Sequence, residues 1–269
     1  MKGEILDVFA KVPAAINELV EEFAAAPVVG DLNVGITQYS FWFFIAAAVF
    51  LTIMFVFIKK QTLEPKGFFV NGVEYLIEYV QEDVAKGILG ATWRTHFPFL
   101  ATIFMFIMIN NYIGLIPGMK TGTGTMGVTF ALALVAFCYF IYYGCKKHGV
   151  MGYIKSIAPS GVPFPMNALV WVIEVFSLFL RLVTLAVRLF CNMFAGHVVM
   201  GSFAIIASLI CAPAIEQVSA AAVVGALPAA GAVAVLLVLY AVELIVAFVQ
   251  AYVFTLLSAV YIQIAESEH

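Results

Sequence analysis

The sequence predicts an all-α integral membrane protein: transmembrane helices, a surface amphipathic helix and a C-terminal hairpin of two long, steeply tilted helices. Hydrophobic residues make up 64% of the 269 residues and charged residues 11%, and the mean hydropathy is +1.06. A soluble domain carries about a quarter charged residues. Several apolar runs reach the roughly 20 residues that cross a bilayer, and the last two are far longer.

Composition also limits the partners. A net charge of −3 predicts no nucleic-acid partner. The four cysteines show neither metal-ligand spacing nor a disulfide framework, and we expect no cofactor and no metal. Residues 1–34 are expected to form an external N-terminal amphipathic segment, because their start is acidic and lacks the pattern of a signal peptide. Residues 35–269 are expected to form a single membrane domain.

Three runs have the length of a simple span. The first, 39–58, stops at two lysines, and the second is 97–118. The third, 128–145, also stops at two lysines. Between the first two spans, segment 61–95 alternates polar and apolar residues at helical spacing, which predicts an amphipathic helix at the membrane surface. Its apolar side would be Val73, Leu76, Ile77 and Val80, and its acidic side Glu74, Glu78, Glu82 and Asp83.

The basic residues predict the orientation. Lys and Arg concentrate in 59–95 and 146–160, whereas the loop 118–127 holds only Lys120. Basic loops stay on the cytoplasmic side. We therefore expect a multi-pass protein with its N-terminus external and its C-terminus cytoplasmic.

The last third of the chain predicts two helices that are too long for simple spans. Residues 165–211 correspond to roughly 70 Å of helix and residues 229–265 to roughly 55 Å, against a hydrocarbon core of about 30 Å. The segment 213–228 is bounded by prolines, which predicts that the helix is interrupted there and that the chain turns. Such helices must be tilted, bent or laid along the membrane plane.

Polar residues follow one stripe of the first long helix. Glu174, Arg181 and Arg188 are seven residues apart, a step that drifts only about 20° around a helix. Thr184 falls near the same line and Asn192 lies one turn further on. The second long helix carries Glu243 and Gln250, also seven apart.

An antiparallel register would bring these polar residues together. In an antiparallel pair of helices, the numbers of two facing residues add up to a nearly constant value. The pair Arg188 and Gln250 and the pair His197 and Glu243 give nearly the same value. The same register places the turn between the two prolines. On its own helix His197 points away from Arg188, because each residue rotates by about 100°.

Structural roles are open for several of these residues. Glu174 and Arg181 can form an ion pair inside a bundle, and His197 can simply bind a backbone carbonyl. Arg188 differs, because no acid of this chain occupies a matching position. An intramembrane arginine without an internal partner indicates a partner in another chain.

Three stretches together resemble a known family. They are "LAVRLFCNMFAGH" (185–197), "ELIVAFVQAYVFTLLSAVYI" (243–262) and "FPFLATIFMFIMINNYIGLIPG" (97–118). They are similar to the a subunit of the membrane sector of F-type ATP synthases, over roughly residues 35–269. The resemblance implies a bacterial inner-membrane subunit without a catalytic site of its own, whose partners are the c-ring, the b-type peripheral stalk and the lipid bilayer.

The resemblance also implies residue roles. Arg188 would be the essential arginine facing the c-ring carboxylate, with Asn192 and Gln250 positioning it or a water molecule. The external half-channel would contain His197 and Glu243, which stand exchanged relative to many bacterial members, and the cytoplasmic one Glu174, Arg181 and Thr184. The expected function is a stator with two aqueous half-channels that translocates protons past the rotating ring.

Two other classes compete with this interpretation. A proton- or ion-coupled secondary transporter also places charges at mid-membrane, but the chain shows no internal repeat with matched broken helices. A haem or quinone subunit would need more intramembrane histidines, and only His197 lies within a long apolar helix. We expect protons rather than sodium ions, since a sodium path would require more oxygen ligands.

Overall fold

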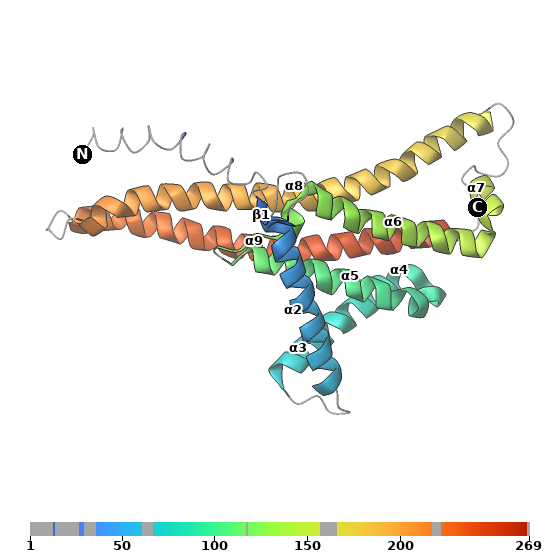
Figure 1. Cartoon of the computed structure of the whole chain (residues 1–269), viewed down its shortest axis with the longest axis horizontal. Coiled ribbons are helices and arrows are strands. Elements are labelled where there is room, and N and C mark those ends of the chain that lie inside the picture. Colours follow the sequence, from blue (N-terminus) through green and yellow to red (C-terminus); the bar gives the residue numbers. More distant parts are fainter. Residues whose placement is uncertain are drawn as a thin grey trace.

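The chain folds into helices that pack along one long hairpin (Figure 1). The structure, a computed structural model, describes residues 13, 27–29, 36–60, 67–116, 118–156, 166–216 and 222–267. Five of its helical stretches are long and apolar enough to cross a membrane. Two short strands, β1 (Pro27–Val29) and β2 (Ile36–Thr37), form an antiparallel pair before the first long helix. The predicted all-α membrane fold is therefore confirmed, whereas most of the predicted segment 1–34 lies outside the described residues.

Helix α2 (Gln38–Lys60) covers the first predicted span. It is apolar around most of its circumference and largely exposed in the isolated chain, as expected of a helix facing lipid or other subunits. Its last turn carries Lys59 and Lys60, whose positive charge is favourable at a helix C-terminus.

An amphipathic stretch follows in four short pieces: α3 (Phe68–Tyr79), the π-helix η1 (Val80–Lys86), α4 (Gly87–Leu89) and the 3₁₀ turn η2 (Gly90–Thr92). The apolar side chains of Val73 and Val80 are buried, and Leu76 and Ile77 are half-buried. The four acidic residues predicted for the opposite side are all exposed. The amphipathic prediction holds, but the seven-residue π-helix was not predicted.

The central helices are α5 (Trp93–Gly114) and α6 (Met126–His148). They overlap the predicted runs 97–118 and 128–145, and α5 begins and ends about one turn earlier than its run. The short turn η3 (Gly122–Gly124) lies between them, and α7 (Val150–Ser156) follows α6. In its second turn α5 contains Pro98, whose ring removes one backbone N–H donor from the helix.

The hairpin consists of α8 (Met166–Glu216) and α9 (Ala222–Glu266), which run antiparallel (Figure 1). At about 1.5 Å per residue they are roughly 75 and 68 Å long. Both are longer than predicted, since each continues past the proline expected to end it. The N-terminal part of α8 diverges from α9, and α2 runs steeply across the hairpin, so α2 and the hairpin cannot both stand upright in one membrane.

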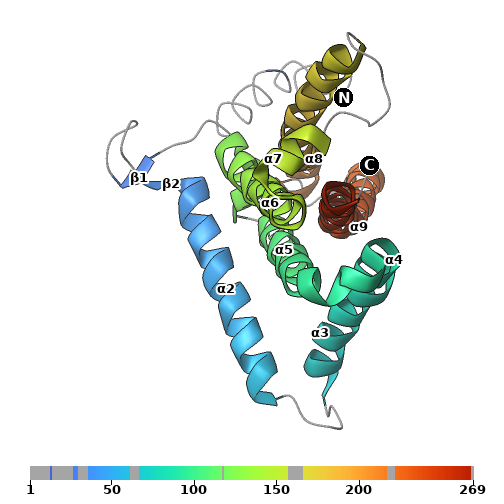
Figure 2. The same ribbon diagram turned by 90° about the vertical axis from the view of Figure 1, so that its right-hand side faces the viewer.

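The core lies where α5 and α6 pack against the hairpin (Figure 2). Its largest fully buried apolar side chains come from α5 (Leu100, Phe104 and Ile107), α8 (Leu189 and Met193) and α9 (Phe254 and Ile262). This packing holds the middle of α8 and α9, where the polar residues lie, in a fixed position relative to α5.

Candidate functional site: the polar centre of the hairpin

Gly196 of α8 packs directly against the side chain of Glu243 of α9. A β-carbon at position 196 would overlap the Glu243 carboxylate, so only glycine leaves room for it. This contact lies in the antiparallel register that the sequence predicted for His197 and Glu243. Glu243 is buried, and its Oε1 atom has no hydrogen-bond partner among the described residues.

His197 lies beside this contact with both ring nitrogens against carbonyl oxygens. Its Nδ1 is 2.8 Å from Met193 O one turn back, and its Nε2 is 2.9 Å from Gly114 O at the end of α5. The ring also interacts electrostatically with Glu243. A neutral imidazole donates through one nitrogen only, so both carbonyls are hydrogen bonded at once only when the ring is protonated. The carbonyl contact and the His197–Glu243 proximity, which the sequence left as alternatives, thus coexist.

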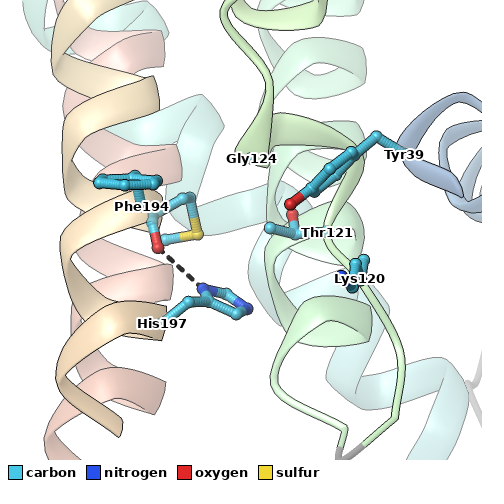
Figure 3. Close-up of a pocket in the computed structure, with 7 residues that line it drawn as sticks. Tyr39, Lys120, Thr121, Gly124, Phe194 and His197 are labelled. Atoms are coloured by element: carbon cyan, nitrogen blue, oxygen red, sulfur yellow. Dashed lines mark hydrogen bonds between the residues drawn. The ribbon is translucent and has the colours of Figure 1, made fainter. Parts of the chain in front are cut away.

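A small pocket opens beside His197 (Figure 3). The close-up shows His197 and Phe194 on α8 facing Tyr39 of α2 and the loop that carries Lys120 and Thr121. Lys120 Nζ lies 5.7 Å from the centre of the Tyr39 ring. The full lining is Tyr39, Lys120, Thr121, Gly124, Met193, Phe194 and His197. The loop predicted to be external therefore forms one wall of a space that reaches His197.

A buried polar network fixes this loop. The Thr121 hydroxyl donates to Asn110 O (3.2 Å) and lies 2.7 Å from the Thr123 hydroxyl, which donates to Asn111 Oδ1 (2.8 Å). Asn111 Nδ2 in turn donates to Ala247 O on α9 (3.3 Å). The side chains of Thr121, Thr123 and Asn111 are at most 2% exposed. Sequence analysis missed this network, because its partners are backbone carbonyls and loop hydroxyls that carry no pattern of their own.

The two arginines of the stripe have different surroundings. Arg181 Nη2 lies 3.9 Å from Glu174 Oε2, and its guanidinium carbon lies 5.5 Å from the centre of the Tyr261 ring on α9. The predicted Glu174–Arg181 pair is therefore present. Arg188 is exposed and makes no hydrogen bond or ion pair with any residue that the structure describes.

Among the residues that the structure describes, Gln250, Asn192 and Thr184 form no hydrogen bond with Arg188. Gln250 is buried, and Asn192 is half-buried with an Nδ2 atom that has no partner in the described part of the chain. Thr184 donates to the carbonyl of Leu180 (2.8 Å) on its own helix. The roles assigned to these three residues remain predictions.

A fourth cluster lies at the other end of α5, where His96 contacts Glu266 and Tyr139. No pattern in the sequence marks this cluster, because its members are up to 170 residues apart. Over the described ranges, no group of three or more His, Cys, Asp or Glu residues is placed to hold a metal ion.

Together, the fold and these residues define a multi-pass membrane protein with charged and proton-binding groups inside its longest helices. The sequence model of the ATP synthase A chain family matches residues 40–263. The chain belongs to this family, and it is therefore a membrane-sector subunit of F-type ATP synthase. Membership supports the role of a proton-translocating stator and does not favour a secondary transporter.

Individual relatives agree. The chain is 36% identical over 246 residues to ATP synthase subunit a of Chlorobium phaeobacteroides, covering 89% of this chain and 68% of the relative. It is 35% identical over 241 residues to the subunit of Bartonella quintana, covering 87% and 88%. For Brucella canis the identity is 37% over 240 residues, with coverages of 87% and 90%.

Proposed function

We propose that this subunit forms two aqueous half-channels, one open to each side of the membrane, that lead protons to and from a rotating c-ring passing Arg188. His197 and Glu243 belong to the external half-channel. The cytoplasmic half-channel contains Glu174, Arg181 and Thr184. Asn192 and Gln250 position Arg188 or a water molecule beside it, and the unpartnered Asn192 Nδ2 atom supports this role because buried donors usually bind water.

The observation that carries the proposal is the exposed and unpartnered guanidinium of Arg188. An arginine keeps its charge at any relevant pH, and a charge in hydrocarbon costs several kcal/mol or more. Arg181, on the same helix, has a carboxylate and an aromatic ring of this chain beside it. Arg188 therefore requires a counter-charge from another subunit, and a mid-membrane carboxylate on each c subunit supplies one.

Electrostatics then gives the direction of each proton transfer. A c-ring carboxylate that crosses the lipid-facing arc must be protonated, because the ionised form is too costly there. Opposite Arg188 the ionised form is stabilised and the proton leaves. Since Arg188 cannot release its own proton, it also separates the two half-channels. A membrane potential of 100 mV supplies about 2.3 kcal/mol for each charge that crosses.

His197 and Glu243 act as one proton-transfer site in this scheme. They interact electrostatically, and the Glu243 carboxylate retains an unpartnered oxygen. We assign the start of the external path to the small pocket between Tyr39, Lys120 and His197, because it reaches the His197 ring.

The surroundings of the subunit follow from the same proposal. Its partners are the c-ring, b-type peripheral stalk subunits and the lipid bilayer, and catalysis takes place elsewhere in the complex. The N-terminus is external and the C-terminus cytoplasmic, as the basic residues in 59–95 and 146–160 predict. The transported ion is the proton.

The test is Arg188→Ala in the complete ATP synthase. ATP-driven proton pumping and ion-driven synthesis should both be lost, whereas ATP hydrolysis by the detached catalytic head should persist. Vesicle acidification and ATPase assays measure the two activities. Proton pumping at the wild-type rate in this variant would overturn the proposal.

A further inference from the structure

A buried histidine joins three helices at the end of α5 that carries the basic residues. His96 is 1% exposed. Its Nε2 lies 3.0 Å from Glu266 Oε1, in the last turn of α9, and its Nδ1 lies 3.2 Å from the Tyr139 hydroxyl oxygen of α6. The proposed proton path does not use His96, so its burial and its two partners require another explanation.

One tautomer satisfies all three groups. With the proton on Nε2, the ring donates to the Glu266 carboxylate while Nδ1 accepts the Tyr139 O–H. Hydrogen bonds to an ionised acceptor are shorter and stronger than those between neutral groups. His96 therefore connects a neutral donor on α6 to a carboxylate on α9, and neither contact requires water.

Further contacts hold the same turn of α9. Lys147 Nζ of α6 donates to the Glu266 carbonyl oxygen (2.7 Å). Phe99 of α5 stacks on Tyr139, with ring centres 3.6 Å apart. A β-carbon at Gly144 would lie 3.2 Å from Ala265 O, so α6 and α9 approach each other closely here. The last turn of α9 is thus held against α6, and the hydrogen bond between His96 and Glu266 connects it to α5.

This turn lies next to the proposed cytoplasmic path. Tyr261, little more than one helical turn before Glu266, has its ring 5.5 Å from the Arg181 guanidinium carbon. The same ring is 5.9 Å from Phe140 of α6. A displacement of the last turns of α9 would therefore move Tyr261 away from Arg181 and change the surroundings of the Arg181–Glu174 pair.

We infer that His96 is a positioning residue for proton translocation, acting through Glu266 to hold the C-terminal turns of α9 and thereby Tyr261 against Arg181. It contacts neither the c-ring nor the proton path in this role. The inference rests on the proposed function, because proton flux is its readout.

The experiment compares His96→Leu, His96→Gln, Glu266→Ala and the double variant His96→Leu/Glu266→Ala in complete ATP synthase in inverted membrane vesicles. We measure ATP-driven acidification per assembled complex. His96→Leu and Glu266→Ala should each lower the rate by roughly tenfold, as loss of a buried charge-assisted hydrogen bond implies. The double variant should be no slower than the slower single variant. Gln retains a donor near the position of Nε2, so His96→Gln should return the rate to within about threefold of wild type.

Tyr139→Phe and Tyr142→Phe provide a matched pair. Tyr139 touches His96, whereas Tyr142 is 61% exposed on the same helix. Only Tyr139→Phe should lower the rate, by about twofold, because it removes the neutral hydrogen bond to His96. If the complex with His96→Leu does not assemble, Glu266→Gln is the deciding variant. An acidification rate at least threefold lower than wild type supports the inference, and a wild-type rate overturns it.

Two other outcomes overturn the inference. One is a wild-type rate in His96→Leu, and the other is single-variant losses that multiply in the double variant, since independent sites add their free energies. Neither outcome depends on Arg188→Ala. Wild-type pumping by Arg188→Ala would instead overturn the proposed function, so the two failures are distinguishable.

Discussion

Arg188 and His197 lie on the same helix, yet their surroundings are opposite. Arg188 is exposed and has no partner among the described residues, whereas His197 lies between carbonyl oxygens of α8 and α5 and beside the Glu243 carboxylate. Under the proposed function, Arg188 meets its counter-charge in another subunit, whereas the His197 ring already has partners within this chain. The comparison teaches that the groups of the proposed proton path can be held internally while the proposed surface toward the c-ring makes no internal contact.

The largest effect is expected from a larger side chain in the region of His197 and Glu243. Gly196→Ala places a methyl group where the Glu243 carboxylate lies, and the carboxylate must turn away from His197. Overpacking of this kind costs about 1–3 kcal/mol, so we expect a loss of proton flux of roughly 10- to 100-fold. The complex should still assemble, because a flexible carboxylate rather than backbone gives way.

The matched control for this prediction is Gly231→Ala on α9, where an added β-carbon meets nothing within 4 Å. It should leave vesicle acidification unchanged. Equal losses in the two variants would show that helix flexibility, and not the Gly196–Glu243 contact, matters.

A smaller effect is expected from exchanging the two proton-binding groups. His197→Glu and Glu243→His should each lower the flux strongly. The residual flux of the double exchange should be about fivefold higher than the product of the two single-variant residual fluxes, a coupling of about 1 kcal/mol. Full recovery is not expected, because a carboxylate at position 197 would face the carbonyl oxygens of Met193 and Gly114. Acidification rates over the complete double-mutant cycle provide the measurement. Strictly multiplicative losses would show that His197 and Glu243 act independently.

The smallest effect concerns the loop that supports the internal region. Thr123→Val keeps the shape of the side chain but leaves Asn111 Oδ1 without its donor. An unsatisfied buried group costs about 1–3 kcal/mol of stability. Because the rest of the complex still holds the loop, we expect only a two- to threefold decrease in flux, together with dissociation of the complex at a lower temperature. Thr102→Val serves as the control, since Thr102 is exposed and bonds only to its own helix. No difference between the two variants would mean that the network does not support His197.

Sequence patterns predicted those parts of the molecule that depend on neighbours along one helix. The membrane fold, the α2 boundaries, the amphipathic side of α3 and the Glu174–Arg181 pair all follow from composition and helical period. The register between α8 and α9 could be predicted because polar residues were rare enough for their positions to be compared.

Other features depend on contacts that have no periodic signature. The π-helix η1 arises from a one-residue shift of the hydrogen-bond partner, which no spacing of apolar residues reports. His96 and Glu266 are 170 residues apart, and either alone looks like an ordinary polar residue at a helix end. The Gly114 carbonyl that contacts His197 belongs to the backbone, so no residue type marks it.

The charged residues inside the hairpin have a consequence for the biosynthesis of the protein. α8 carries Glu174, Arg181 and Arg188, and a single charged residue at the centre of an inserting helix costs about 2.5–3.5 kcal/mol at the translocon. α9 supplies Tyr261 to Arg181, and Gly196 accommodates Glu243 of α9. Each helix therefore lowers the cost of inserting the other, and entry into the bilayer is more favourable for the two helices as a pair than for either one released into lipid alone.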